Sequence, residues 1–168
     1  MDYKEAKNKF VQPWGALGSQ WGINKTMAQI HALLMVSHEA VSMEDIMEEL
    51  QISRGNASMN LRALMDWGIV YKEYKAGERR EFFTAEKDLD ELAVKISRER
   101  SKREIKPALK VLKEVSSISA DNTAEERHFV DQTNKLYDFV LQADNVLDKI
   151  TEYKDNWLAQ LLVKFMRK

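Results

Sequence analysis

The spacing of apolar residues predicts a helix at the start of the chain. In residues 1–22 the large apolar side chains recur at the spacing of one helix face, and they are Phe10, Trp14, Leu17 and Trp21. Pro13 is expected to kink this helix or to mark a restart, because proline fits best in a first turn. The glycines at positions 15, 18 and 22 weaken the helix and are expected to mark close backbone approach.

Residues 24–86 predict a compact module that begins with short helices. Asn24 is a candidate N-cap for a helix with apolar positions at Met27, Ile30, Leu34 and Met35. Ser42 and Asp45 form a capping pattern that opens a second helix over 43–50, with an inward face of Ile46, Met47 and Leu50. After a brief turn, Ser53 caps a third helix, which ends at Gly68 and has an inward stripe of Ala57, Leu61, Leu64 and Met65.

After Gly68 the hydrophobic period falls from 3.6 to about 2, which predicts strands. The segments IVYKEY and EFFTAE flank KAGERR, so a β-hairpin with Gly77 in its loop is expected. Three helices followed by a hairpin is the order of a winged helix-turn-helix. In that module the third helix presents its N-terminal half to the DNA major groove.

The outward face of the third helix has the composition of a DNA reader. With Ala57 at the centre of the buried side, the opposite face carries Gly55, Met59, Arg62 and Asp66. Arg54, Asn56 and Ser58 flank that face, and the capping residue Ser53 is also a candidate DNA contact. Small residues allow a helix to sit deep in a groove, and Arg and Asn are the residue types that read guanine and adenine edges. The alternative is a winged helix used for protein contacts, in which these residues are merely exposed.

Further phosphate contacts are expected from the wing and from the start of the first module helix. The wing holds Lys75, Arg79 and Arg80, of which Arg79 is the first choice because Arg80 has neighbouring carboxylates available for pairing. Lys25 opens its helix and is a second phosphate candidate. A solvated hairpin loop is the alternative for the wing residues.

The C-terminal part, residues 87–168, is predicted to be helical and to dimerise. Residues 95–113 carry eight Lys or Arg and two Glu, and Pro107 is expected to interrupt the helix there. Residues 121–153 are acidic and carry a heptad-like seam of Phe129, Thr133, Leu136, Val140, Ala143, Leu147 and Ile150. The basic stretch could contact DNA or an anion, but pairing with the acidic helix within a dimer is the favoured interpretation. A short last helix, DNWLAQLLVKFMRK, is expected to add to the interface rather than to bind a membrane surface.

Composition narrows the class of protein. The chain has 168 residues, 44% hydrophobic and 32% charged, with a net charge of −1, so any DNA contact comes from a local basic patch. No cysteine is present, which excludes disulfides and cysteine-ligated zinc and fits a reducing cytoplasm. Neither a signal peptide nor an apolar run of membrane-spanning length is recognisable.

The sequence gives weaker signals for an effector site, a metal site or a catalytic site. Trp14 and Trp21 raise the hypothesis of an aromatic cage for a quaternary ammonium effector, against the alternative that they are packing anchors. His31 and His38 share a helix face but have no third ligand at a zinc-like spacing, so no metal site is expected. No nucleophile motif, phosphate loop or acid–base pair is present, and neither an enzyme nor a cofactor is predicted.

Over residues 12–118 the chain resembles the GbsR branch of the MarR-type transcriptional regulators. The similarity rests on GINKTMAQIHALL, on the block from Ser53 to Val70, on the wing GERREFF and on REIKPALKVLKEV. It implies a homodimer that binds a pseudo-palindromic operator, usually as a repressor. In the namesake of the branch it also implies control of genes for choline or glycine-betaine handling.

The predicted fold class is therefore mainly α with a small β wing. The expected divisions are an N-terminal dimerisation helix (1–23), a winged helix-turn-helix (24–86) and a helical dimerisation and effector region (87–168). The predicted function is sequence-specific transcriptional control on double-stranded DNA in the cytoplasm, as a homodimer, with release by a small effector as a further hypothesis. The alternative function is a winged-helix adaptor that docks a protein. Dimerisation residues are expected to be Phe10, Trp14, Phe129, Leu136, Val140 and Leu147.

Overall fold

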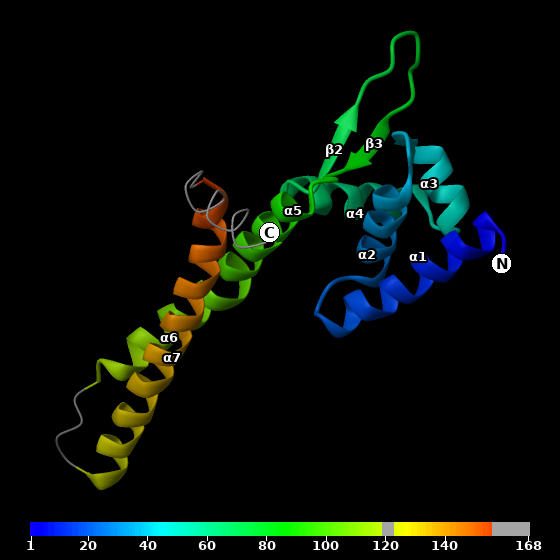
Figure 1. The fold of residues 1–168 in the computed structure, drawn as a ribbon. Coiled ribbons are helices and arrows are strands. Elements are labelled where there is room, and N and C mark those ends of the chain that lie inside the picture. The colour runs from blue at the N-terminus through cyan, green and yellow to red at the C-terminus, as the bar shows by residue number, and fades with distance from the viewer. Residues whose placement is uncertain (119–122, 156–168) are drawn as a thin grey trace. The chain divides into compact units, whose positions relative to one another are not determined.

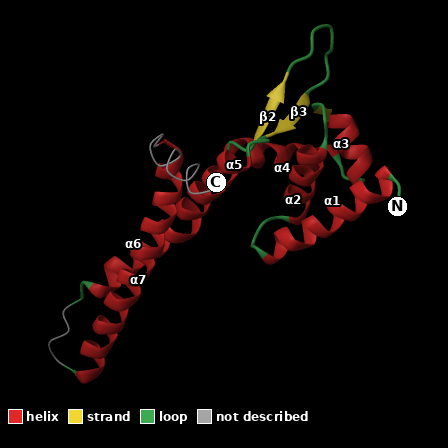
Figure 2. Ribbon diagram, viewed as in Figure 1, coloured by secondary structure: helices red, strands yellow, loops and turns green. Residues whose placement is uncertain are grey.

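The computed structural model describes residues 1–118 and 123–155, with side chains described up to residue 149. It divides into two compact units, Met1–Leu92 and Ala93–Lys168. The predicted fold class, mainly helical with a small β wing, is confirmed (Figure 2). Among the described residues, no helix has both the length and the apolar character needed to cross a membrane.

The first unit places a small sheet beside a group of short helices (Figure 1). Its elements, in chain order, are α1 (Tyr3–Gln20), α2 (Lys25–Val36), β1 (Val41–Ser42), α3 (Met43–Leu50), α4 (Arg54–Asp66), β2 (Val70–Glu73) and β3 (Phe82–Ala85). The completely buried side chains come from every layer of this unit and include Ile30, Leu33, Ile46, Leu61, Leu64 and Phe83. One core therefore joins the helices to the sheet.

Capping residues begin the module helices where the sequence predicts them. The Asn24 side chain accepts the Met27 amide at 3.2 Å, and α2 begins at the next residue. Ser42 Oγ accepts the Asp45 amide and donates to the Asp45 carboxylate at 2.6 Å, so the two residues close the first turn of α3 reciprocally. α3 spans Met43–Leu50, as predicted.

Helix α1 packs on α2 through its small residues. α1 runs from Tyr3 to Gln20 without a break, so the restart expected at Pro13 does not occur. Its buried residues are Val11, Gly15 and Gly18. A Cβ atom added at Gly18 would lie 2.4 Å from Ala28 Cβ, and one at Gly15 would lie 2.5 Å from Gln29 Cγ. These glycines mark the predicted close approach, whereas Gly22 has nothing within 4 Å and serves the turn with φ +76°.

The sheet contains one more strand than the sequence predicts. β2 and β3 form the expected antiparallel hairpin, in which Lys72 pairs with Phe83. β1 adds to the other edge of β3, with Val41 opposite Phe83, so the strand order is β1-β3-β2. β1 has only two residues, which are too few to produce an alternating pattern in the sequence.

The second unit is a helical hairpin. Its elements are α5 (Leu89–Arg100, which begins in the first unit), η1 (Ser101–Ile105), α6 (Lys106–Ser116) and α7 (Ala124–Asp155). The interruption expected at Pro107 takes the form of the π-helical turn η1, in which the Lys106 amide donates to the Ser101 carbonyl. This wider turn lets the helix continue into a proline that lacks an amide and would crowd a regular preceding turn. The backbone therefore stays helical on both sides of the proline.

Much of the described apolar surface of this hairpin is exposed. α6 has no fully buried residue. Two buried polar residues of the unit bind each other, since the Ser101 hydroxyl donates to the Asp144 carboxylate at 2.5 Å. Phe129, Leu136, Phe139 and Val146 of α7 are each at least 45% exposed. The predicted last helix falls outside the described residues from residue 156 onward, as does the side chain of Ile150.

Candidate nucleic-acid interface

The third helix of the module, α4, starts from a tight turn. Gln51 adopts a left-handed conformation with φ 54°, and Ser53 accepts the Asn56 amide at 3.3 Å. The turn ends α3 and caps α4 only three residues later, which fixes the direction in which α4 leaves α3. The QIS turn and the Ser53 cap are both as the sequence predicts.

The outward face of α4 has the composition that the helical wheel predicts. Gly55, Met59, Arg62 and Asp66 are exposed, while Ala57, Leu61 and Leu64 are buried on the opposite side. Met59 is 66% exposed although it is a large apolar side chain in the middle of a helix. No atom lies within 4 Å of a Cβ added at Gly55, so open space lies over the start of the helix. The face is available to a macromolecular partner.

Two flanking residues are held by neighbours that the sequence did not single out. Arg54 Nη2 lies 2.6 Å from Glu44 Oε1 of α3. The buried Asn60 amide donates to the Asn56 carbonyl at 2.9 Å and to the Asn56 side-chain oxygen at 2.7 Å. Ser58 is half-buried and so presents less of its hydroxyl than the wheel suggested. Asn60 sits four residues after Asn56, a spacing that would have signalled the bond.

Two of the three predicted wing cations, Lys75 and Arg80, are held by neighbouring residues. Lys75 Nζ lies 3.6 Å from Glu39 and 4.5 Å from the Phe82 ring centroid. Arg80 forms two hydrogen bonds with Glu78, at 3.0 and 3.1 Å, and its guanidinium carbon lies 5.3 Å from the Phe82 ring centroid. The hydrogen-bonded guanidinium holds the pKa of the Glu78 carboxyl below its usual range.

Arg79 differs from the other two predicted wing cations, Lys75 and Arg80. Its side chain is exposed, and no described residue forms an ion pair or hydrogen bond with it. Gly77, with φ +81°, makes the turn that precedes it. Lys25 is also exposed, but it begins α2 with its carbonyl facing Gly15 of α1.

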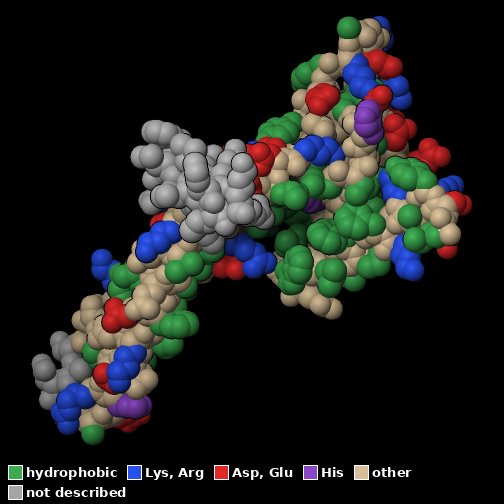
Figure 3. Space-filling view, in the orientation of Figure 1, with side chains coloured by type: hydrophobic (Ala, Val, Ile, Leu, Met, Phe, Trp, Pro, Cys, Tyr) green, Lys and Arg blue, Asp and Glu red, His purple; other side chains and the backbone are tan. Residues whose placement is uncertain are grey.

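Phe10 and Trp14 of α1 form an exposed cluster with Trp21, which caps the end of that helix. The Phe10 and Trp14 ring centroids are 5.1 Å apart, and the rings of Trp14 and Trp21 meet edge to face at 6.4 Å. Figure 3 shows hydrophobic side chains gathered over this part of the first unit. Because the two tryptophan rings already contact each other, a cage around an ammonium group needs one ring to rotate. The ligand role of Trp14 and Trp21 stays a prediction.

The predicted seam of α7 has two environments. Phe129 and Leu136 are exposed, while Thr133 is buried and Val140 and Leu147 are half-buried within the chain. Phe139 and Val146, which lie off the predicted seam, are the most exposed large apolar side chains among those described in this helix, at 70% and 58%. Part of the positive charge of residues 95–113 is neutralised within the same segment, because Lys102 and Arg103 both pair with the buried Glu99.

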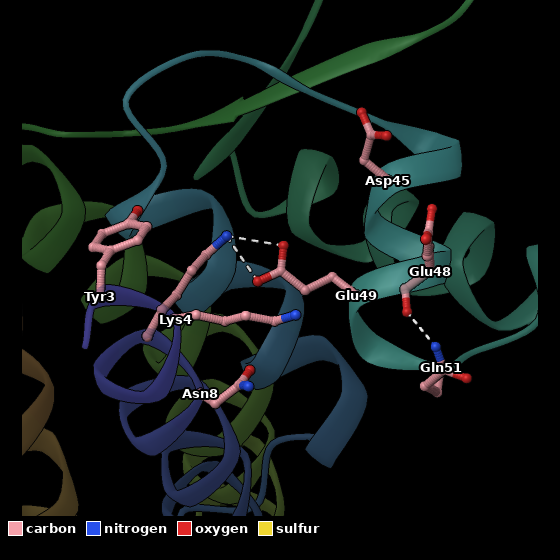
Figure 4. A pocket seen from close by; sticks show the side chains of 8 residues that line it. Tyr3, Lys4, Asn8, Asp45, Glu48, Glu49 and Gln51 are labelled. Atoms are coloured by element: carbon pink, nitrogen blue, oxygen red, sulfur yellow. Dashed lines mark hydrogen bonds and ion pairs between the residues drawn. The ribbon is translucent and has the colours of Figure 1, made fainter. Parts of the chain in front are cut away.

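A groove of about 650 Å³ lies between α1 and α3 (Figure 4). It is lined by Lys4, Lys7, Asp45, Glu48 and Glu49, together with Tyr3, Asn8 and Gln51. Lys7 pairs with Glu49 at 2.7 Å across it, tying the N-terminal helix to α3. The charges are of both signs, so the groove has no single preference for an anion or a cation. No described residues form a group of three or more His, Cys, Asp or Glu able to hold a metal ion.

A model of the MarR family matches residues 21–81, which contain α2, α3, α4 and most of the wing. The chain carries a MarR-family domain. The matched residues include α4, the exposed third helix, and β2 with the loop of the wing, while β3 begins directly after them. The family resemblance inferred from the sequence motifs is thereby confirmed.

Two individual proteins extend the similarity beyond the MarR domain. The HTH-type transcriptional repressor GbsR of Bacillus subtilis (strain 168) is 23% identical over 141 residues, which cover 84% of this chain and 75% of the relative. A solved structure described as the crystal structure of a transcriptional regulator matches 90% of this chain and 99% of its own, with a TM-score of 0.67 and 19% identity. At that identity the second match shows a shared fold.

Proposed function

We propose that this protein is a sequence-specific DNA-binding transcriptional regulator. The observation that carries the proposal is the outward face of α4, where Gly55, Met59 and Arg62 are exposed above a fully packed inner face. In a MarR-family domain this helix enters the major groove, and its short side chains allow a deep fit. The named similarity to a transcriptional repressor supports the same function.

The regulator acts as a homodimer on a pseudo-palindromic operator. The second unit exposes Phe129, Leu136, Phe139 and Val146 along one helix, and α1 exposes the Phe10–Trp14–Trp21 cluster. Exposed apolar surface of this kind favours burial against a second copy. Two copies related by a two-fold axis would present two α4 helices to successive major grooves, about 34 Å apart.

Repression is the direction of control that the named relative supports. A small effector bound near the dimerisation helices would change the spacing of the two reading helices and so release the DNA. Binding to chromosomal operators places the protein in the cytoplasm. Neither a cofactor nor a catalytic reaction is part of the proposal.

The test is a selection of binding sites from random duplex DNA with the full chain. The consensus and a scrambled duplex are then titrated by fluorescence anisotropy at two salt concentrations. A two-fold symmetric consensus preferred by about a thousandfold or more is expected. Absence of enrichment, with only weak salt-driven binding, would reject the proposal in favour of a winged helix that docks a protein.

Replacing Arg62 with alanine is expected to relax operator discrimination. Arg62 lies on the exposed face of α4, where its guanidinium can reach a guanine edge. Loss of one such contact costs about tenfold in preference for the consensus, which the same titrations measure. An unchanged preference would remove Arg62 from the reading surface.

Replacing Arg79 with alanine is expected to weaken binding to the consensus and to the scrambled duplex by the same factor. Its guanidinium is exposed and pairs with no described residue, which suits a phosphate contact, so the slope of log K against log salt should fall by about one. Arg80→Ala is the matched control, because Arg80 is already committed to Glu78. If Arg80→Ala changed the salt slope as much as Arg79→Ala, the assignment would be wrong.

A further inference from the structure

The ion pair between Glu44 and Arg54 joins the two helices of the helix-turn-helix at the reading surface. Glu44 is the second residue of α3, and Arg54 is the first residue of α4. The bond from Arg54 Nη2 to Glu44 Oε1 is 2.6 Å long, yet the two side chains are 63% and 45% exposed. An exposed pair of this kind adds little to the stability of a fold, so its effect is mainly on where the guanidinium points.

The carboxylate is anchored independently of the arginine. Glu44 sits in the first turn of α3, where its own backbone amide binds the carboxylate, and this bond, followed by the one from Arg54, lowers the pKa of Glu44. The neighbouring acid, Asp45, is occupied with the Ser42 cap. Glu44 is therefore an ionised acceptor on the first turn of α3, and the longer arginine side chain is the partner that becomes oriented.

The pair leaves Arg54 with free donors. A guanidinium carries five N–H groups, and the bond to Glu44 is made through Nη2 alone. The second N–H of Nη2 therefore remains available, and together with the N–H of the nitrogen on its own side it forms a two-donor face for O6 and N7 of a guanine edge. Holding an arginine in this way reduces the side-chain entropy lost when it binds a base.

We propose that Glu44 is a positioning residue for DNA recognition, which orients Arg54 toward a guanine of each half-site. Its negative charge also opposes binding to DNA that offers Arg54 no guanine, because the carboxylate then approaches the phosphate backbone without compensation. Glu44 thus raises selectivity at the expense of affinity for DNA in general. The inference rests on the proposed function of α4 as a DNA-reading helix.

The experiment compares wild type, Glu44→Gln, Arg54→Ala and the double variant on the selected consensus, on consensus duplexes with each guanine replaced in turn, and on a scrambled duplex. Glu44→Gln is expected to bind the scrambled duplex a few-fold more tightly and to lose about tenfold in preference at one guanine position. Arg54→Ala should lose preference at the same position. Adding Glu44→Gln to Arg54→Ala should cost no further preference, because the carboxylate acts through the guanidinium.

Glu48→Gln is the matched control, since Glu48 is exposed on the same helix one turn later and its loss changes the net charge equally. It is expected to shift affinity for all duplexes by one common factor. The positioning role is overturned if Glu44→Gln behaves in the same way, or if its loss of preference adds to that of Arg54→Ala. A wild-type protein that selects no consensus would reject the proposed function itself, which the selection reveals before any variant is made.

Discussion

Replacing Gly18 with alanine is expected to lower the free energy of unfolding by about 2–3 kcal/mol. The added methyl group would lie 2.4 Å from Ala28 Cβ, well inside van der Waals contact. Ala28 has no rotamer with which to move aside, because its Cβ is fixed to the backbone of α2. The clash is relieved only when α1 separates from α2, which exposes part of their shared surface.

The sign of this effect makes it diagnostic. Glycine to alanine inside an exposed helix normally raises stability by about 1 kcal/mol, since alanine has the higher helix propensity. Urea unfolding followed by circular dichroism would measure the free energy of unfolding of Gly18→Ala and of wild type. If Gly18→Ala were as stable as wild type, the close packing of α1 on α2 would be wrong.

Gly55→Ala is the matched control within the same unit. Gly55 is also inside a helix, but nothing lies within 4 Å of its added Cβ, so this variant is expected to be more stable than wild type. If the space over Gly55 had no function, alanine at this position would only raise the stability of the protein. If α4 enters a DNA groove, Gly55→Ala should weaken DNA binding while it stabilises the fold.

Acidification from pH 7 to pH 4.5 is expected to cost about 2 kcal/mol of stability through His31 alone. Burial, followed by the charge of Lys87, lowers the pKa of His31 in the folded protein to about 4. The unfolded chain has a histidine pKa near 6.5, so between these two pKa values His31 is protonated in the unfolded chain and neutral in the folded protein. The contribution of His31 is complete above pH 6.5 and is lost as the pH falls toward 4.

The test compares urea unfolding of wild type and His31→Gln at the two pH values. The stability of His31→Gln should fall less on acidification, by about 2 kcal/mol, because the variant has no buried imidazole to protonate. His38→Gln is the control, since His38 lies exposed just beyond the same helix. Equal acid sensitivity of His31→Gln and wild type would contradict the prediction.

Lys87 supplies the charge that, after burial, lowers the pKa of His31, and it also closes α2. Its ammonium group donates to the carbonyls of Leu34, Met35 and Ser37 at 2.5, 2.7 and 3.0 Å. These are terminal carbonyls that a helix leaves without partners, and a cation there also favours the helix dipole. The sequence did not predict these bonds, because Lys87 lies 50 to 53 residues after the carbonyls that it binds and the whole wing lies between them.

The sequence by itself determined the elements of the module and their inward faces. The Asn24, Ser42 and Ser53 caps, the stripe through Ala57, Leu61 and Leu64, and the hairpin around Gly77 are local features. Each depends on residues three or four apart or on a single backbone angle, so the pattern of the chain is enough to predict it. The family motifs are likewise strings of neighbouring residues.

Only the tertiary structure decided which side chains are already occupied and which are free. Arg54 is held by Glu44, Arg80 by Glu78 and Lys75 by Glu39, while Arg79 lies free among the described residues. It also divided the α7 seam into Thr133, which is buried, and Leu136, which is exposed. Helical spacing gives the direction of a side chain from its own axis, but the presence of a partner depends on where another element lies.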